Sequence, residues 1–266
     1  MTGRMFAAMV LATGAAIALA AGAGRADPFA TAVVSYTAGT GAAAGYDDPT
    51  TALGGPERFT GEGVWPGDVT MFNPPWGTDE LVSIGEGGSL IVAFDHPVTD
   101  APANPYGLDL LVFGNTGFID SGGTAGGLFG SGAGTVRVSQ DGSTWYPLAG
   151  VEADGVWPTQ GYTDSSGPYA ADGSTPSDAT KPVAPSVTWS GKTYAELLAA
   201  YDGSAGGTGI DLGPTGLPWI QYVEISVPVG AGSAAEIDAL ADVAPEPGTL
   251  ALLAVGAGAA LARRRR

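Results

Sequence analysis

The chain has no cysteine and a single histidine, His96, so any chemistry must rest on carboxylates and aromatic rings. These counts exclude cysteine nucleophiles and zinc sites built from several histidines. A serine triad would have to use His96, and no Gly-x-Ser-x-Gly turn is present. Paired carboxylates can hydrolyse glycosidic bonds, and the 27 acidic residues offer many pairs. A carbohydrate-active enzyme therefore stays open as an alternative, but no catalytic residue is predicted.

Acidic residues in strand-like segments point to a calcium site. Ca²⁺ takes about six to eight oxygen ligands, which an acidic, turn-rich chain supplies through carboxylates and carbonyls. Asp109, Asp238 and Asp242 lie in apolar runs, where acids on the wet faces of neighbouring strands can converge. We therefore expect these three residues to form one structural Ca²⁺ site. The alternative is that they are solvated surface acids.

Four of the six tryptophans adjoin a proline, namely Trp65, Trp76, Trp157 and Trp219. Because proline disfavours central strands, we expect these indoles on loops or at strand ends. A flat ring in such a place can stack on a sugar. The sequence thus predicts these four as ligand-binding residues for an extracellular polysaccharide. The alternative is that they plug the ends of a sandwich core.

The elements that must position these residues are mainly strands. Alternating or apolar runs predict strands with one buried face at residues 33–36, 89–94, 108–113, 223–227 and 237–243. Asp141-Gly142 between two further runs, 135–139 and 144–148, is a strong hairpin signal. With 44 glycines, 20 prolines and few charged residues, the composition favours many short strands joined by turns.

One short helix is predicted after Thr193, which can form a capping box with Glu196, and Gly203 is expected to end it. We expect this helix to act as a lid over one sheet edge. Residues 122–134 and 163–185 lack periodicity and predict long loops. The expected fold is therefore all-β: an antiparallel β-sandwich or jelly roll with one short helix and long Gly- and Pro-rich loops.

The N-terminus has the features of a secretory signal peptide. Arg4 precedes an apolar stretch, and small residues follow as far as Ala26. This order of charged, apolar and small residues predicts a signal peptide over residues 1–26 that is removed on export. The mature chain would then begin near Asp27.

The C-terminus combines three features in a fixed order. Pro245, Glu246 and Pro247 precede an apolar run, and the chain ends in Arg263, Arg264, Arg265 and Arg266. A terminal arginine cluster resists translocation, so the run is expected to be held in the inner membrane as a helix. Residues 247–262 would reach about 24 Å as a helix, slightly short of a ~30 Å hydrocarbon core. Such a marginal anchor suits a transient stop.

The charge of the chain changes when both ends are removed. The full chain carries a net charge of −17, from 27 acids and 10 bases. Residues 27–247 keep all 27 acids but only four bases, which leaves 23 net negative charges. Such a surface repels nucleic acid, so nucleic-acid binding is excluded. Residues 27–243 are expected to form a single β-sandwich domain, held without disulfides by its core.

Pro-Glu-Pro, a short apolar span and an arginine cluster resemble the PEP-CTERM sorting signal, here over residues 244–266. The resemblance implies export by the secretion machinery and processing by an exosortase, a membrane cysteine protease-transpeptidase of bacteria with an outer membrane. It also implies a precursor anchored in the inner membrane and facing the periplasm. The mature form would then lie at the cell surface or outside the cell.

A second resemblance lies in the hairpin. The pattern V-S-x-D-G-x-x-W at residues 138–145 resembles galactose-binding-like, discoidin-type jelly rolls. Residues 236–238 are similar to the closing strand of jelly-roll carbohydrate-binding modules, and this likeness implies calcium at Asp238. We therefore predict a non-catalytic protein of the cell surface or extracellular matrix. A calcium-supported glycan-binding module and a carbohydrate-active enzyme are the alternatives.

Overall fold

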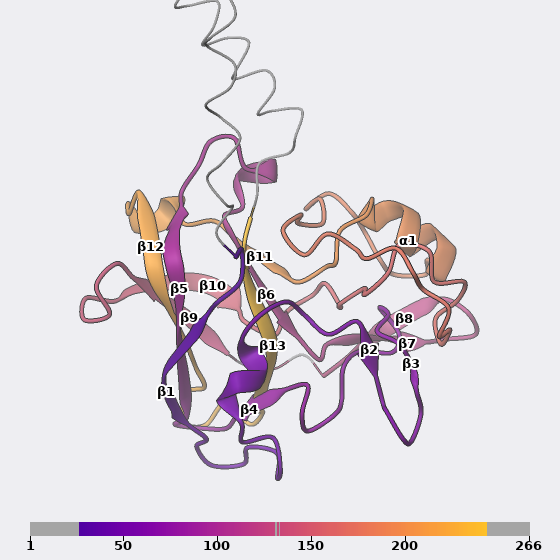
Figure 1. Ribbon diagram of the computed structural model, residues 1–266, viewed down its shortest axis with the longest axis horizontal. Coiled ribbons are helices and arrows are strands. Elements are labelled where there is room, and N and C mark those ends of the chain that lie inside the picture. Colours follow the sequence, from indigo (N-terminus) through magenta and orange to yellow (C-terminus); the bar gives the residue numbers. More distant parts are fainter. Residues whose placement is uncertain (1–26, 131, 133, 244–266) are drawn as a thin grey trace, which may run out of the picture.

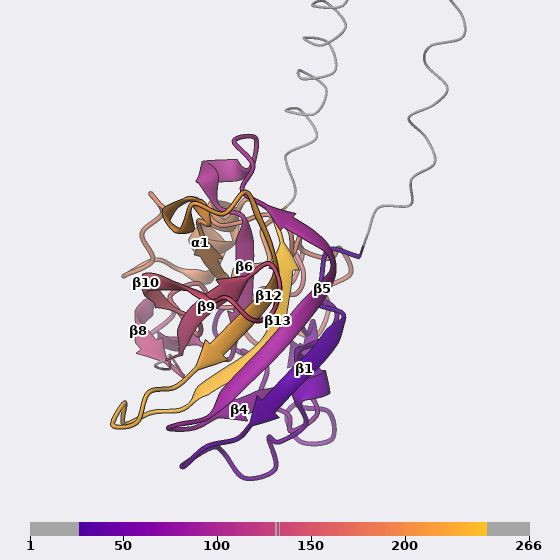
Figure 2. The same cartoon turned by 90° about the vertical axis from the view of Figure 1, so that its left-hand side faces the viewer.

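The computed structural model describes residues 27–130, 132 and 134–243, and it consists mainly of antiparallel strands (Figure 1). Two sheets face each other, as Figure 2 shows from the side of the larger one. The five-stranded sheet has, in spatial order, β1 (Ala32–Thr37), β5 (Ser89–Thr99), β12 (Trp219–Ser226), β9 (Thr135–Ser139) and β10 (Tyr146–Glu152). The four-stranded sheet has β11 (Thr208–Ile210), β6 (Leu110–Gly114), β13 (Ala235–Asp242) and β4 (Val82–Ile84). The predicted all-β, antiparallel, sandwich-like architecture is confirmed.

The predicted strands appear at the expected places. The five runs fall on β1, β5, β6, β12 and β13, and the Asp141-Gly142 turn joins β9 to β10. Gly142 has a positive φ of 70°, which glycine adopts without steric strain. Leu90, Val92 and Phe94 of β5 are at most 1% exposed and share one hydrophobic cluster with residues of β6, β13 and β4. This cluster is the core between the two sheets.

The four-stranded sheet is buried on both faces. Beyond the core, Leu111 and Phe113 of β6 pack with Ala239 and Ala241 of β13 in a separate cluster that also contains Ala205. All five residues of β6 are buried, and β13 has no solvated face. The expectation of a wet face on residues 237–243 is therefore wrong, because a further layer of chain covers this sheet.

That layer is a side lobe, at the right of Figure 1, built from two small hairpins, one helix and their connections. Its elements are β2 (Phe59–Thr60), β3 (Gly67–Asp68), β7 (Gly117–Asp120), β8 (Ala125–Phe129) and α1 (Tyr194–Tyr201). Met71, Phe118 and Leu197 belong to its own hydrophobic cluster. Helix α1 therefore packs on the β7–β8 hairpin, and the residues just before it pair with the edge of β8. The stretch 122–134 differs from the prediction, since it contains β8.

Helix α1 begins and ends as the sequence predicts. Thr193 accepts a hydrogen bond from the Glu196 N–H, and the Glu196 side chain in turn accepts from the Thr193 N–H, which completes the capping box. After Tyr201, Asp202 and Gly203 have positive φ values of 51° and 83°. This left-handed backbone ends the helix.

The remaining helical turns are short. They are η1 (Pro49–Ala52), η2 (Pro105–Gly107) and η3 (Gly213–Thr215). Residues 163–185 form neither helix nor strand, as predicted. Among the described residues, no helix is long and apolar enough to cross a membrane. The predicted signal peptide and the predicted C-terminal membrane helix lie outside those residues.

Candidate ligand-binding pocket

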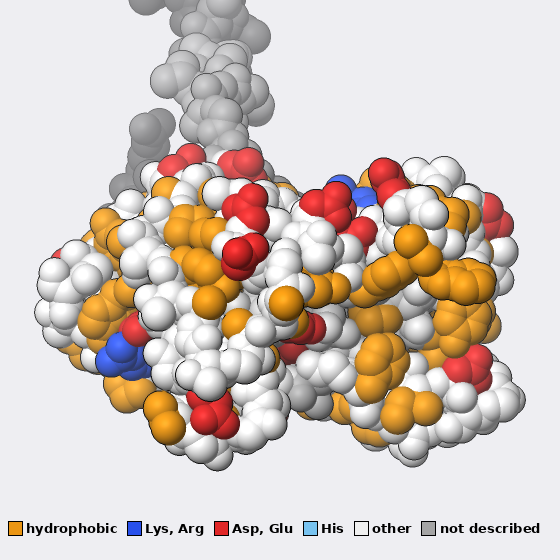
Figure 3. Space-filling model, turned by 90° about the horizontal axis from the view of Figure 1, so that it is seen from below, with side chains coloured by type: hydrophobic (Ala, Val, Ile, Leu, Met, Phe, Trp, Pro, Cys, Tyr) orange, Lys and Arg blue, Asp and Glu red, His pale blue; other side chains and the backbone are white. Residues whose placement is uncertain are grey.

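A pocket of about 410 Å³ opens beside the β2–β3 hairpin, next to the segment 76–80. Three aromatic residues contribute to its lining, namely Tyr46, Phe59 and Trp76. Four acids also line it, namely Glu57, Glu62, Asp79 and Glu80. Seen from below, acidic side chains lie in the hollow beside the side lobe, and hydrophobic side chains gather along the lobe (Figure 3). The site therefore combines flat apolar surface with negative charge.

The backbone of Trp76 is held on both sides. Glu80 Oε2 accepts hydrogen bonds from the N–H groups of Trp76 and Gly77, both at 2.8 Å. The Tyr46 hydroxyl donates to the Trp76 carbonyl oxygen. On the hairpin, a Cβ atom at Gly61 would lie 2.9 Å from Trp76 Cζ2, so the indole packs where only a glycine leaves room. Trp76 is thus a fixed aromatic surface, 37% exposed.

Glu57 is positioned from beneath by a buried carboxylate. The Glu57 N–H donates to both oxygens of Asp238, at 3.2 and 3.1 Å. Burial, followed by the charges of Glu80 and Asp79, raises the pKa of Glu57 above its ordinary value. Burial also raises the pKa of Asp238 well above its ordinary value, and the charge of Glu57 adds to this. Negative charge is therefore concentrated and poorly solvated on this side of the pocket.

The four predicted tryptophans do not form one site. Trp76 lines the pocket, and Trp65 lies at the tip of the same hairpin, 77% exposed. Trp157 packs edge-on against the buried Tyr201, with 6.0 Å between ring centroids, and lines a separate pocket of about 380 Å³. Trp219 is half-buried at the start of β12. Trp157 therefore fits the core-plug alternative, whereas Trp65 and Trp76 lie where a ligand can reach them.

The three predicted calcium ligands are not brought together, and this part of the prediction needs correction. Asp238 is the extra residue of a β-bulge in β13 and turns toward Glu57. Asp242, at the end of the same strand, lies 3.2 Å from His96 Nε2. Asp109 is buried and accepts hydrogen bonds from three donors, namely Ala101 N, Asn104 Nδ2 and Leu212 N. The three carboxylates do not converge because both faces of β13 are covered by other parts of the chain.

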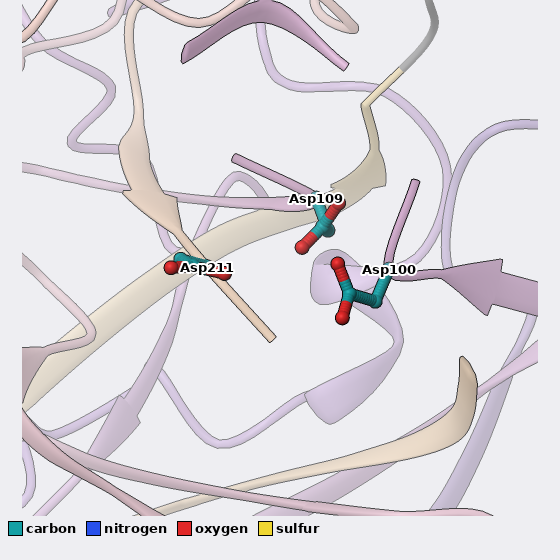
Figure 4. Close-up of side chains that lie close together, drawn as sticks. All are labelled: Asp100, Asp109 and Asp211. Atoms are coloured by element: carbon teal, nitrogen blue, oxygen red, sulfur yellow. The ribbon is translucent and has the colours of Figure 1, made fainter. Parts of the chain in front are cut away.

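Asp109 instead lies near two other acids. Carboxylate oxygens of Asp100, Asp109 and Asp211 lie within 4.8 Å of one another. Figure 4 shows the three side chains close together. The sequence argument missed Asp100 and Asp211 because they lie outside the strand-like runs. The three hydrogen bonds to Asp109 compensate for the burial of its carboxylate. They also hold the neighbouring loops in place. Calcium binding stays a prediction, and equal melting temperatures with Ca²⁺ and with chelator would remove it.

The pocket acids were not singled out from the sequence either. Trp76 was found because it follows a proline, and Asp79 and Glu80 lie within four residues of it. Tyr46 and Glu57 had no such signal, because both come from loops whose positions depend on the packing of the sheets. The sequence therefore predicted Trp76, one aromatic residue of the pocket, but not the acidic residues that line it.

Comparison with known proteins bears on the C-terminus. Residues 243–266 match the family model of the PEP-CTERM protein-sorting motif. A search of curated proteins finds no match for this chain. The predicted sorting residues, Pro245 to Pro247 and Arg263 to Arg266, lie within the matched segment and outside the described residues. By this motif, the chain is an exported protein that passes through a membrane-anchored precursor and is processed by an exosortase.

Proposed function

We propose that the mature protein is a non-catalytic component of the cell surface or extracellular matrix that binds polysaccharide through the pocket beside Trp76. The observation that carries this function is the fixed, part-exposed indole of Trp76 in a pocket of about 410 Å³. Aromatic faces stack on the apolar faces of sugar rings, and carboxylates accept hydrogen bonds from hydroxyl groups. Trp65 lies outside the pocket lining, at the exposed tip of the β2–β3 hairpin. The galactose-binding-like fold expected from residues 138–145 stays a prediction.

The position of the pocket supports a role outside the membrane. Ala30 N donates to Leu240 O at 3.0 Å, so the two described ends of the chain lie side by side. These ends lie toward the top of Figure 1, while the β2–β3 hairpin lies at the lower right. The pocket therefore lies on a different part of the domain from the end that continues into the sorting segment.

Titration of the mature protein with a panel of polysaccharides, followed by tryptophan fluorescence, tests this function. We expect one or more glycans to change the emission, and Trp76→Ala to weaken binding at least tenfold. Trp219→Phe is the matched control, because Trp219 does not line the pocket, and it should bind as the wild type does. No response across a broad panel would contradict the proposal.

A carbohydrate-active enzyme is the second candidate, favoured by one observation. Glu57 has a raised pKa in an acid-lined pocket, as a general acid requires. Two other acids near the pocket accept hydrogen bonds from the backbone and are not free to act as a second catalytic carboxylate. Glu80 accepts from the Trp76 N–H, and Asp238 accepts from the Glu57 N–H. Release of reducing ends that is lost in Glu57→Gln would support the enzyme. Binding without product release would support the non-catalytic role.

A further inference from the structure

The charge of the pocket goes beyond what a neutral sugar needs. Its lining residues, all between Tyr46 and Glu80, include four acids and no lysine, arginine or histidine. The buried carboxyl group of Asp238 lies behind Glu57, and burial raises its pKa and so favours its neutral form. Arg58, next to Glu57, lowers the pKa of Glu57, but burial and the charges of Glu80, Asp79 and Glu62 outweigh it. A bound cation would relieve this repulsion.

The pocket also contains a nearly buried acceptor with a spare oxygen. Glu80 is 8% exposed, and its Oε2 takes hydrogen bonds from Thr60 Oγ1, Trp76 N and Gly77 N. Its other oxygen, Oε1, accepts no hydrogen bond from the residues that the structure describes. Neither side-chain oxygen of Glu57 accepts one within the same residues. Two carboxylates at the pocket therefore have oxygens that are not occupied by a described residue, and a donor-only cationic group such as an ammonium can replace water there.

The aromatic wall decides what kind of cation fits. The backbone of Trp76 is held by hydrogen bonds with Glu80 and Tyr46, and its indole packs against Gly61. A rigid indole beside carboxylates favours a ligand with a flat apolar face and a nearby positive group. An amino sugar has both, since its pyranose ring stacks and its ammonium pairs with an acid. A bare metal ion would leave the indole unused.

We propose that the pocket selects glycans that carry free amino groups, such as polymers of glucosamine. The ammonium group pairs with Glu57 and Glu80, while the sugar ring stacks on Trp76. This selectivity rests on the proposed glycan-binding function and adds the charge of the ligand to it. Uronic-acid polymers are rejected by the same carboxylates, and neutral sugars gain only the stacking contribution.

Calorimetric titration of the mature protein with four oligosaccharides tests the selectivity. The probes are a glucosamine hexamer, its fully N-acetylated counterpart, a neutral glucose oligomer and a uronic-acid oligomer. Below the pKa of its amino groups, we expect the glucosamine hexamer to bind at least tenfold more tightly than the N-acetylated one. The advantage should shrink at high salt, because exposed charges are screened.

Three variants identify the groups responsible. Glu57→Gln should remove most of the preference for the free amine, while Trp76→Ala should weaken both hexamers. Asp95→Asn, which removes one exposed acid outside the pocket, should leave the preference unchanged and controls for net charge. Circular dichroism of each variant establishes that it folds.

The possible outcomes separate the two proposals. Equal binding of both hexamers would overturn amine selectivity and leave glycan binding intact. No binding of any glycan would overturn both. Binding of oligolysine without binding of glucosamine would replace the glycan by a basic peptide as partner and would also overturn the inference.

Discussion

The backbone N–H of Glu57 donates to both carboxylate oxygens of Asp238, although the two residues lie 181 positions apart in the sequence. Asp238 lies at a bulge of β13, inside a sheet that is covered on both faces. Its carboxylate therefore joins the sandwich to the pocket beside β2. Asp238 was expected to hold a metal ion at the surface. It instead binds the backbone of Glu57, which lines the pocket.

The two roles of Asp238, acceptor and charge, can be separated by substitution. Asp238→Ala removes the acceptor for the Glu57 N–H and should lower the free energy of unfolding by about 1–3 kcal/mol. Asp238→Asn keeps an acceptor oxygen and cannot ionise, so its free energy of unfolding should gain on that of the wild type as the pH rises, because burial disfavours the charged form of Asp238. Urea denaturation measures both. Equal losses in the two variants would show that the charge itself holds the pocket together.

The buried carboxyl group of Asp154 should make the free energy of unfolding depend on pH. Asp154 is 1% exposed, and burial raises the pKa of its carboxyl to about 7 from an ordinary 3.8, although hydrogen bonds from Thr116 oppose this. The folded state therefore holds the proton more tightly than the unfolded chain. The contribution of Asp154 to the free energy of unfolding should be largest at about pH 4 and below, and it should fall as the pH rises toward 7. The difference in pKa corresponds to about 4 kcal/mol at most.

Urea denaturation between pH 5 and pH 8 tests this dependence. Asp154→Asn keeps an acceptor for Thr116 and should flatten the profile, with its largest gain over the wild type at pH 8. Asp47→Asn, at an exposed position, is the control and should follow the wild-type slope. Parallel profiles for the wild type and Asp154→Asn would assign the pH dependence to other acids, such as Glu236, whose pKa burial also raises.

The tryptophans of the side lobe should differ in their effect on stability. Trp157 packs against the fully buried Tyr201, so Trp157→Ala should cost about 2–3 kcal/mol through lost packing. Trp65 is largely exposed, and Trp65→Ala should change the free energy of unfolding by less than about 0.5 kcal/mol. Thermal and urea unfolding compare the two. A large loss for Trp65→Ala would mean that the hairpin tip is structural.

Processing of both ends is predicted by the sorting motif and the signal peptide. Intact-mass analysis of the protein recovered from the cell surface or medium should show a chain that begins near Asp27. That chain should end near Pro247 and lack the four arginines. Replacing residues 263–266 by serine should reduce processing, because the cluster no longer opposes translocation. Full-length protein in the cytosol, with Arg266 intact, would contradict export.

Features that depend on neighbouring residues could be predicted from the amino-acid sequence. Alternation placed β1, β5 and β12, Asp141-Gly142 set the β9–β10 turn, and the capping box between Thr193 and Glu196 set the start of α1. The sorting motif also depends on the order of a few adjacent residues. Hydrogen bonds and side-chain periodicity over a few positions are local, so they can be recognised without knowing the fold.

Which surfaces are exposed to solvent depends on how the layers of the fold pack together. The side lobe covers the outer face of the four-stranded sheet, so Asp238 became a buried anchor and could not join Asp109 and Asp242 in a metal site. The pocket likewise combines Tyr46, Glu57 and Glu80 from separate loops. Contacts between such distant segments depend on how whole layers pack, and neither periodicity nor local spacing contains that information.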